Sequence, residues 1–189
     1  KSQLADFRKE FEERMVTFDK ALKGDRKDPY YEDAITSSGE RFSTLLLAHV
    51  LRSKGEKSVA LTASAAGIHA IGQPLNGCAD LRRTGAEMNM KVNPMLTDAV
   101  PIITGFYGMN EKGRPLTFGR GGSDYSAAVV ANALMADELQ IWTDVNGFMS
   151  ADPRIIPDAV SIEEMNYGEA AELAYFGAKI LHPRTIEPV

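Results

Sequence analysis

Short β-type stretches alternate with helical runs along this chain, and the alternation limits the folds that it can adopt. The β-type stretches are apolar and rich in β-branched residues, and they cover 57–63, 99–108 and 139–143. Strands that alternate with helices are typical of an α/β sandwich with a mostly parallel sheet. In such a sheet, ligands bind where the strands end. We therefore expect the loops at 105–106, 119–124 and 143–154 to form one site.

Apolar periodicity and helix-ending residues predict four helices. They cover 4–22, 31–54, 123–135 and 167–176. The first is expected to end near Gly24 and to pack its apolar face on the core. The second is expected to be interrupted at 37–39, with its strongest part from Glu40 to Gly55. Residues 64–99 fit either helix or loop, and residues 109–115 have the composition of a turn.

The stretch "FGRGGSD" combines bare backbone with a cation at the start of a predicted helix. Gly121 and Gly122 let a ligand approach the backbone, and the first amides of a helix carry the positive end of its dipole. Arg120 adds a forked cation that suits a carboxylate or a phosphate. The stretch is no P-loop and no dinucleotide fingerprint, because it lacks their lysine and third glycine. It predicts an anion site, and a plain turn capped by Ser123 or Asp124 is the alternative.

The segment from Ser37 to Glu40 fits two roles. A serine followed three residues later by a glutamate is a capping box, which starts a helix. In the other role, Glu40 binds the ammonium group of a substrate.

Two later segments also have alternative roles. Thr143 and Asp144 end a predicted strand, and an Asp-Pro-Arg segment ending at Arg154 follows, either as a turn or as part of a site. Lys179 lies between a helix end and a proline break. It is either a solvated lysine or a cation that reaches a phosphate.

Charge and composition exclude several classes of function. The chain has 189 residues and a formal net charge of −5, so it lacks the basic face that nonspecific nucleic-acid binding needs. The single cysteine, Cys78, excludes an internal disulfide and a cysteine zinc site, and three scattered histidines disfavour a histidine metal site. No apolar stretch reaches the ~20 residues that span a bilayer, and the N-terminal stretch is charged, unlike a signal peptide. A cytoplasmic location is expected, without a membrane partner.

Five stretches together resemble the aspartate kinases of the amino-acid kinase superfamily. The last three run almost without gaps over about 70 residues, which is more specific than any single motif. The stretches are "SSGERFS" (37–43), "VPIITGFYG" (100–108), "FGRGGSDYSAAVVANAL" (118–134), "IWTDVNGFMSADPRIIPDA" (141–159) and "EAAELAYFGAKILHPRTIEP" (169–188). The resemblance implies a three-layer α/β/α fold and ATP-dependent phosphorylation of the L-aspartate side-chain carboxylate. The product would be 4-phospho-L-aspartate, on the route to lysine, threonine and methionine.

The resemblance also implies roles for individual residues in substrate binding. Glu40 would contact the aspartate ammonium, and Phe106 would border that pocket. Asp124 would organise the catalytic lysines rather than accept a proton. The aspartate carboxylates would be held by Arg120 and by the backbone of Gly121, Gly122 and Ser123.

A second set of residues is implied for the nucleotide. Lys179 would lie on the transferring phosphate as a catalytic residue. Magnesium would arrive with ATP, so no separate metal site is expected. The nucleotide site would be lined by Thr143, Asp144, Met149, Arg154, Lys179 and Ile180. Met149 stands where many relatives have a tyrosine, which implies softer stacking on the base.

The sequence departs from the family pattern at both ends. Family members open with a strand that ends in Lys-Phe-Gly-Gly, and many carry regulatory domains after the catalytic one; neither is found here. We expect an N-terminally incomplete catalytic domain that is inactive alone and whose full-length parent is a homo-oligomer. Residues 1–99 would mainly bind aspartate and residues 100–189 mainly the nucleotide. The alternatives are another small-molecule kinase of the superfamily and a catalytically silent module that binds an amino acid or a nucleotide.

Overall fold

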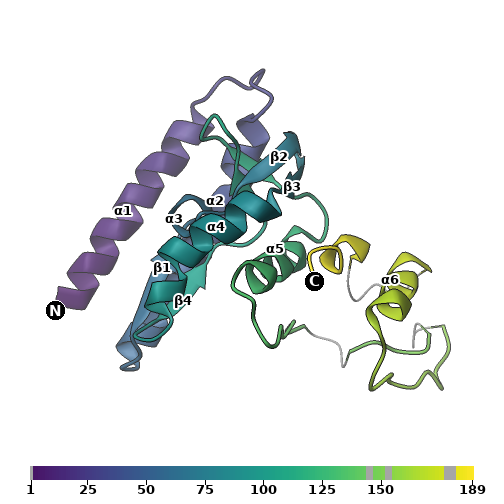
Figure 1. The fold of residues 1–189 in the computed structure, drawn as a ribbon. Helices are drawn as coiled ribbons and strands as arrows, with labels where there is room; N and C mark the ends of the chain where they lie inside the picture. The colour runs from purple at the N-terminus through teal and green to yellow at the C-terminus, as the bar shows by residue number, and fades with distance from the viewer. Residues whose placement is uncertain (1, 144–146, 152–154, 177–181) are drawn as a thin grey trace.

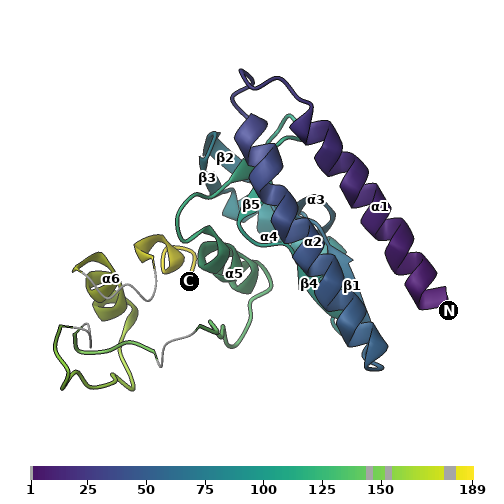
Figure 2. The same ribbon diagram turned by 180° about the vertical axis from the view of Figure 1, so that it is seen from behind.

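Helices and short strands alternate along the chain, which confirms the predicted α/β class (Figure 1). The computed structural model describes residues 2–143, 147–151, 155–176 and 182–189. A parallel pair of strands, β1 (Ser58–Leu61) and β4 (Val100–Ile103), runs in register from Ser58 opposite Val100 to Leu61 opposite Ile103. Helix α2 (Tyr31–Ser53) covers one side of this pair, and α4 (Leu81–Lys91) lies on the other, as Figures 1 and 2 show from opposite directions.

Two antiparallel hairpins complete the strand pairing in the described part of the chain. The first joins β2 (Ala70–Gln73) to β3 (Asn76–Ala79), and the second joins β5 (Tyr107–Met109) to β6 (Pro115–Thr117). The predicted turn at 109–115 forms the second connection. The remaining elements are α1 (Ser2–Leu22), α3 (Ala63–Ala66), α5 (Gly122–Ala133), α6 (Tyr167–Phe176) and the 3₁₀ turns η1 (Asn93–Met95) and η2 (Pro183–Thr185).

Helix α1 forms as predicted, but it lies at the edge of the molecule and packs on α2 rather than on the sheet (Figure 2). Phe7 contacts His49 with ring centroids 4.4 Å apart, and Phe11 contacts Phe42 at 5.3 Å. Leu4 and Val16 remain exposed. The prediction of a core-facing helix was therefore only half right. Among the described residues, helix α2 alone covers the apolar stripe of α1, and it covers only one side of that stripe.

Two strand predictions were wrong in detail. The stretch 99–108 is not one strand, because the chain turns at Phe106, whose φ of 72° is in the left-handed region. This turn separates β4 from β5. Residues 139–143 form no strand, and Trp142 in that stretch is 89% exposed. β-Branched and aromatic content favours a strand only where a neighbouring strand supplies ladder bonds and cover.

A buried carboxylate joins three segments at the centre of the fold. Asp33 of α2 is fully buried and accepts hydrogen bonds from Thr117 N at 2.7 Å and Thr117 Oγ1 at 2.6 Å. It also accepts one from Leu75 N at 3.1 Å. Leu75 has a φ of 63° in the two-residue turn between β2 and β3. Asp33 therefore holds both β6 and a strained turn against α2.

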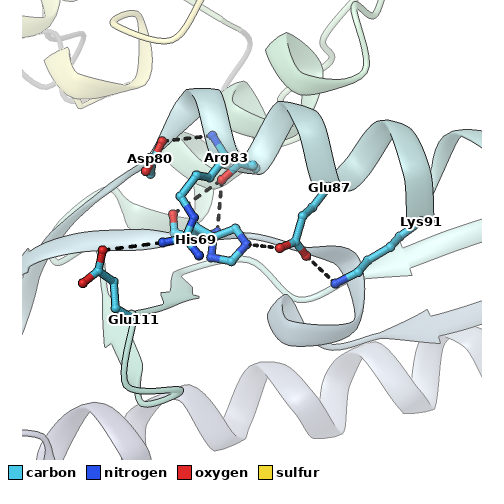
Figure 3. A network of polar contacts seen from close by, with 7 residues as sticks. His69, Asp80, Arg83, Glu87, Lys91 and Glu111 are labelled. Atoms are coloured by element: carbon cyan, nitrogen blue, oxygen red, sulfur yellow. Dashed lines mark hydrogen bonds and ion pairs between the residues drawn. The ribbon is translucent and has the colours of Figure 1, made fainter.

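A polar network anchors α4 to the β2 side of the molecule (Figure 3). Asp80 caps the helix by accepting from Arg83 N at 3.0 Å. Glu87 contacts His69 Nε2 at 2.7 Å and pairs with Lys91 on the next turn. The hydrogen bond from Lys91, and then that from His69, lowers the pKa of the Glu87 carboxyl. The stretch 81–91, which fitted helix or loop by sequence, is therefore a helix held at both ends.

Buried apolar side chains of β1, α3, both hairpins, α4 and α5 form one core cluster, and α2 adds buried residues to the core. Its largest fully buried side chains include Tyr107, Phe118 and Leu45. None of the helices among the described residues has the length and apolar content that a membrane crossing requires.

Candidate functional site

Helix α5 starts without a side-chain cap. Its N-cap residue is Gly121, which has a φ of 68° and hence the left-handed conformation that favours glycine. Neither Ser123 nor Asp124 caps the helix, so that alternative was wrong. The first amides of a helix have no intrahelical acceptor, and here they include those of Ser123 and Asp124. The start of α5 can therefore donate hydrogen bonds to an anion.

Part of the glycine pattern is explained by packing within the chain. A Cβ on Gly121 would lie 2.3 Å from Cβ of His182, and one on Gly122 would lie 2.9 Å from Cδ2 of Phe106. Glycine is therefore required at both positions by neighbouring side chains, whatever binds there. Close approach to a ligand is not needed to explain this pair.

Glu40 lies in the middle of α2, not at the start of a helix. The helix runs unbroken through Ser37 and Ser38, whose hydroxyls both donate to the carbonyl oxygen of Ala34, at 3.3 and 3.0 Å. The predicted interruption and the capping box are therefore both wrong. The serines instead satisfy their hydroxyls by bonding back to the preceding turn. Glu40 is then not used as a cap.

An open cavity of about 480 Å³ brings Glu40 together with the start of α5. Three of the predicted features meet in it: Glu40 from α2, Gly105 from the loop after β4, and Ser123 from the first turn of α5. Thr104 also lines it, and its buried Oγ1 has no hydrogen-bond partner in the described part of the structure. Ser126 and Glu138 line it too, and most of the remaining wall is apolar, including Ile103, Val130, Leu134 and Leu139.

Two predicted residues flank this cavity. Phe106 packs on Gly122 at its edge, as the close approach of its ring shows. Arg120 is exposed one residue before the N-cap. An exposed cation at this position can meet an anion at the start of the helix.

Asp124 is partly buried in the first turn of α5. Burial raises the pKa of its carboxyl above the ordinary value. A helix N-terminus by itself favours a negative charge, so burial and the dipole act in opposite directions on this carboxyl. A carboxyl group whose pKa is shifted by its surroundings is typical of a functional site.

The predicted nucleotide residues are only partly described. Asp144, Arg154, Lys179 and Ile180 lie outside the described residues. Thr143 is exposed, and Met149 forms an isolated antiparallel bridge with Ser161. Neither lines the cavity that contains Glu40.

A second cavity, of about 430 Å³, does not resemble a phosphate site. Three glutamates line it, namely Glu164, Glu169 and Glu172. Their charge would repel the phosphates of a nucleotide. In the described ranges, no group of three or more His, Cys, Asp or Glu side chains is arranged to hold a metal ion.

Sequence reasoning gave no role to Arg184, which ties η2 to the site. Its guanidinium donates to Phe118 O at 3.0 Å and to Gly77 O at 2.8 Å, and it lies over the Tyr125 ring at 4.9 Å. The sequence feature that could have indicated Arg184 is an arginine directly after a proline, a few residues after the predicted Lys179. A forked cation is the residue type that can hold two carbonyls at once.

Comparison with known proteins agrees with these features. The model of the amino acid kinase family matches residues 2–189. Lysine-sensitive aspartokinase 3 of Escherichia coli is 40% identical over 164 residues, which are 85% of this chain and 35% of that protein. The aspartokinase of Geobacillus stearothermophilus is 40% identical over 82% of this chain and 37% of its own length. The chain thus spans little more than a third of these relatives.

A solved structure shows the same fold. The crystal structure of E. coli aspartokinase III in complex with aspartate and ADP superposes with a TM-score of 0.86 at 35% identity. It covers 96% of this chain and 41% of that one. The lysine- and aspartate-bound structure of the same enzyme gives a TM-score of 0.83. These likenesses confirm the predicted α/β fold class with its parallel strands.

Proposed function

This chain belongs to the amino acid kinase family, and we propose that it acts in the ATP-dependent phosphorylation of the side-chain carboxylate of L-aspartate. The observation that carries the proposal is the cavity in which Glu40 faces the uncapped start of α5. Aspartate has one ammonium and two carboxylates. A binding site for it needs an acidic side chain on one side and amides or cations on the other, and this cavity has both.

Individual residues would then bind different groups of the substrate. Glu40 would pair with the ammonium, while the amides at Ser123 and the guanidinium of Arg120 would hold carboxylate oxygens. The hydroxyl of Thr104, which has no partner among the described residues, favours a polar ligand in the same cavity. Phe106 would border the pocket through its packing on Gly122.

The reaction needs no general base, because a carboxylate is already ionised at pH 7. A side-chain carboxylate oxygen of aspartate would form a bond to the γ-phosphorus of ATP as the bond to the β-phosphate oxygen breaks. The products are an acyl phosphate and ADP. Catalysis then depends on positioning and on cations that face the developing charge. Asp124 would organise these cations, and Lys179 would supply one of them.

The nucleotide part of the proposal rests on resemblance and on the ADP in the related structure. Thr143, Asp144, Met149, Arg154 and Ile180 would line that site, and magnesium would arrive with ATP. The proposal includes a cytoplasmic location, where ATP is available. Self-association of the full-length protein is part of the same proposal, and sedimentation would test it.

Titration calorimetry with aspartate and with succinate tests the aspartate site directly. Succinate lacks the ammonium, so the wild-type chain should prefer aspartate. Glu40→Gln should remove that preference and weaken aspartate binding by about 10- to 100-fold, because a charge-assisted hydrogen bond is lost. Arg120→Ala should weaken both ligands.

A matched control removes a different charge from the same cavity. Glu138→Gln changes a carboxylate on the wall that bonds to Gln140. It should bind aspartate as the wild type does. If aspartate binds equally to the Glu40→Gln and wild-type chains, the assignment of Glu40 is wrong. If the wild-type chain binds no aspartate, the proposed function is wrong for this cavity.

A further inference from the structure

A buried serine holds the strained loop at the edge of the cavity. The Oγ of Ser126 accepts a hydrogen bond from Phe106 N at 2.8 Å. The same hydroxyl can donate its proton to either of two carbonyl oxygens. These are Gly122 O at 2.7 Å and Ser123 O at 2.8 Å. Ser126 is 1% exposed, so water does not compete for these bonds.

The loop that Ser126 holds has a conformation that its sequence does not favour. Phe106 has a φ of 72°, which a bulky residue rarely adopts and which costs free energy unless the surroundings impose it. Its carbonyl accepts from Phe118 N at 2.9 Å, so the backbone is held on both sides of the Cα atom. The hydroxyl of Ser126 restrains this backbone on its N–H side, and Phe118 N restrains it on its carbonyl side.

Space around the hydroxyl is restricted as well. A Cβ on Gly105 would lie 3.0 Å from Ser126 Oγ. Gly105 and Ser126 both line the cavity, as does Ser123, whose carbonyl the serine can reach. One hydroxyl therefore links the loop after β4 to the first turn of α5, and both segments line the cavity that Glu40 also lines.

We propose that Ser126 is a positioning residue that sets the separation between the Phe106 loop and the amides at the start of α5, and so determines aspartate affinity. It acts through its hydrogen bond to Phe106 and does not itself contact the substrate. The proposal rests on the function proposed above for this cavity.

The test compares Ser126→Ala with a matched control. Thr84→Val also removes a buried helical hydroxyl that accepts a backbone N–H, in this case from His69 N at 3.0 Å, and it lies on α4 away from the cavity. Both variants should lose similar thermal stability. Only Ser126→Ala should weaken aspartate binding, by about five- to tenfold or more, because it leaves the Phe106 amide without its partner.

Two further measurements separate positioning from general destabilisation. Ser126→Thr keeps the hydroxyl and should restore most of the affinity. Amide hydrogen exchange at Phe106 should be slow in the wild-type chain, fast in Ser126→Ala and unchanged in Thr84→Val. Gly105→Ala, which crowds the same hydroxyl, should weaken binding less when combined with Ser126→Ala than it does alone.

The possible outcomes separate a failure of the role of Ser126 from a failure of the proposed function. If wild type binds aspartate and Ser126→Ala binds it within twofold of wild type, the positioning role is wrong. Equal losses of affinity in Ser126→Ala and Thr84→Val would also overturn it. If wild type binds no aspartate, the function of the cavity fails first, and the role of Ser126 in aspartate affinity fails with it.

Discussion

Arg41 and Tyr107 join α2 to β5. The Nε of Arg41 donates to the Tyr107 hydroxyl at 3.1 Å, and its guanidinium carbon lies 5.3 Å from the ring centroid. Each residue is next in sequence to a residue of the candidate site, Glu40 in one case and Phe106 in the other. The contact therefore couples the acidic wall of the cavity to its strained loop.

Tyr107→Phe should reveal this coupling. The change removes the hydroxyl and keeps the ring, so we expect a stability loss of about 1 kcal/mol and a several-fold weaker affinity for aspartate. Tyr125→Phe is the control, since that hydroxyl accepts from Ala79 N at 3.1 Å instead of meeting α2. Thermal melts and calorimetry would compare the two. An equal effect on aspartate affinity would contradict a specific role for the Arg41 contact.

Asp124→Asn should raise stability at neutral pH. Burial raises the folded-state pKa of Asp124, so its ionised form costs stability at pH values above that pKa. The cost is absent below the unfolded pKa of about 3.9. The melting temperature of the variant should therefore exceed that of wild type at pH 7 and match it near pH 3. Asp98→Asn, at an exposed carboxylate, should change neither value, and a variant less stable than wild type at pH 7 would refute the argument.

Glu87→Gln should have the opposite dependence on pH. The hydrogen bonds from Lys91 and His69 lower the folded-state pKa of Glu87, so its contribution is fully present above the unfolded pKa of about 4.3. It is lost as the pH falls through the folded pKa. Because the pair is partly exposed, we expect a loss of roughly 0.5–1 kcal/mol at pH 7. Urea unfolding at several pH values would measure it.

The control for this measurement is another surface ion pair. Glu111 lies 3.6 Å from Arg83, and its side chain is 81% exposed. Glu111→Gln should change stability by less than Glu87→Gln at pH 7. A Glu87 effect that stays the same at low pH would show that packing, not charge, is responsible.

Asp33→Ala should be among the most destabilising single changes in the chain. It leaves two buried donors of Thr117 and the partly buried N–H of Leu75 without their acceptor, at a cost of about 3 kcal/mol or more. Asp33→Asn should cost less, because an amide oxygen can still accept from Thr117. Asp25→Ala removes an exposed carboxylate that accepts one backbone N–H and should have a small effect. Chemical unfolding would rank the three, and a mild Asp33→Ala would refute the anchoring role.

Arg184→Lys should loosen the end of the chain from α5. Lysine cannot hold the Phe118 and Gly77 carbonyls with one planar group, so about 1.5–3 kcal/mol of local stability should be lost. Hydrogen exchange at 182–189 should become faster while α4 stays protected. Arg26→Lys, at an exposed arginine, provides the comparison. Unchanged exchange at 182–189 would show that the two carbonyl contacts are not needed.

Local patterns in the sequence determined the elements and part of the site. Helix α5 begins at the glycine pair, with Gly121 as its N-cap, because glycine adopts the left-handed backbone needed there at little cost. Helix α6 has the predicted bounds, Tyr167–Phe176. The predicted Glu40 and Ser123 do line one cavity. For Ser123 the sequence signal was its place at a helix start, and for Glu40 it was the type of side chain alone.

Tertiary structure alone decided the remaining features. Ser37 to Glu40 have the pattern of a capping box, yet α2 runs through them. Tertiary contacts hold the helix on both sides of the serines, through Asp33 to Thr117 of β6 and through Ala48 to Ser58 of β1. Residues 139–143 have strand composition and form none, since a strand needs a partner that no local pattern supplies. The hydrogen bonds from Phe106 to Ser126 and from Thr117 to Asp33 join residues 20 and 84 positions apart. Contacts over such separations depend on how the whole chain packs, so local sequence patterns do not predict them.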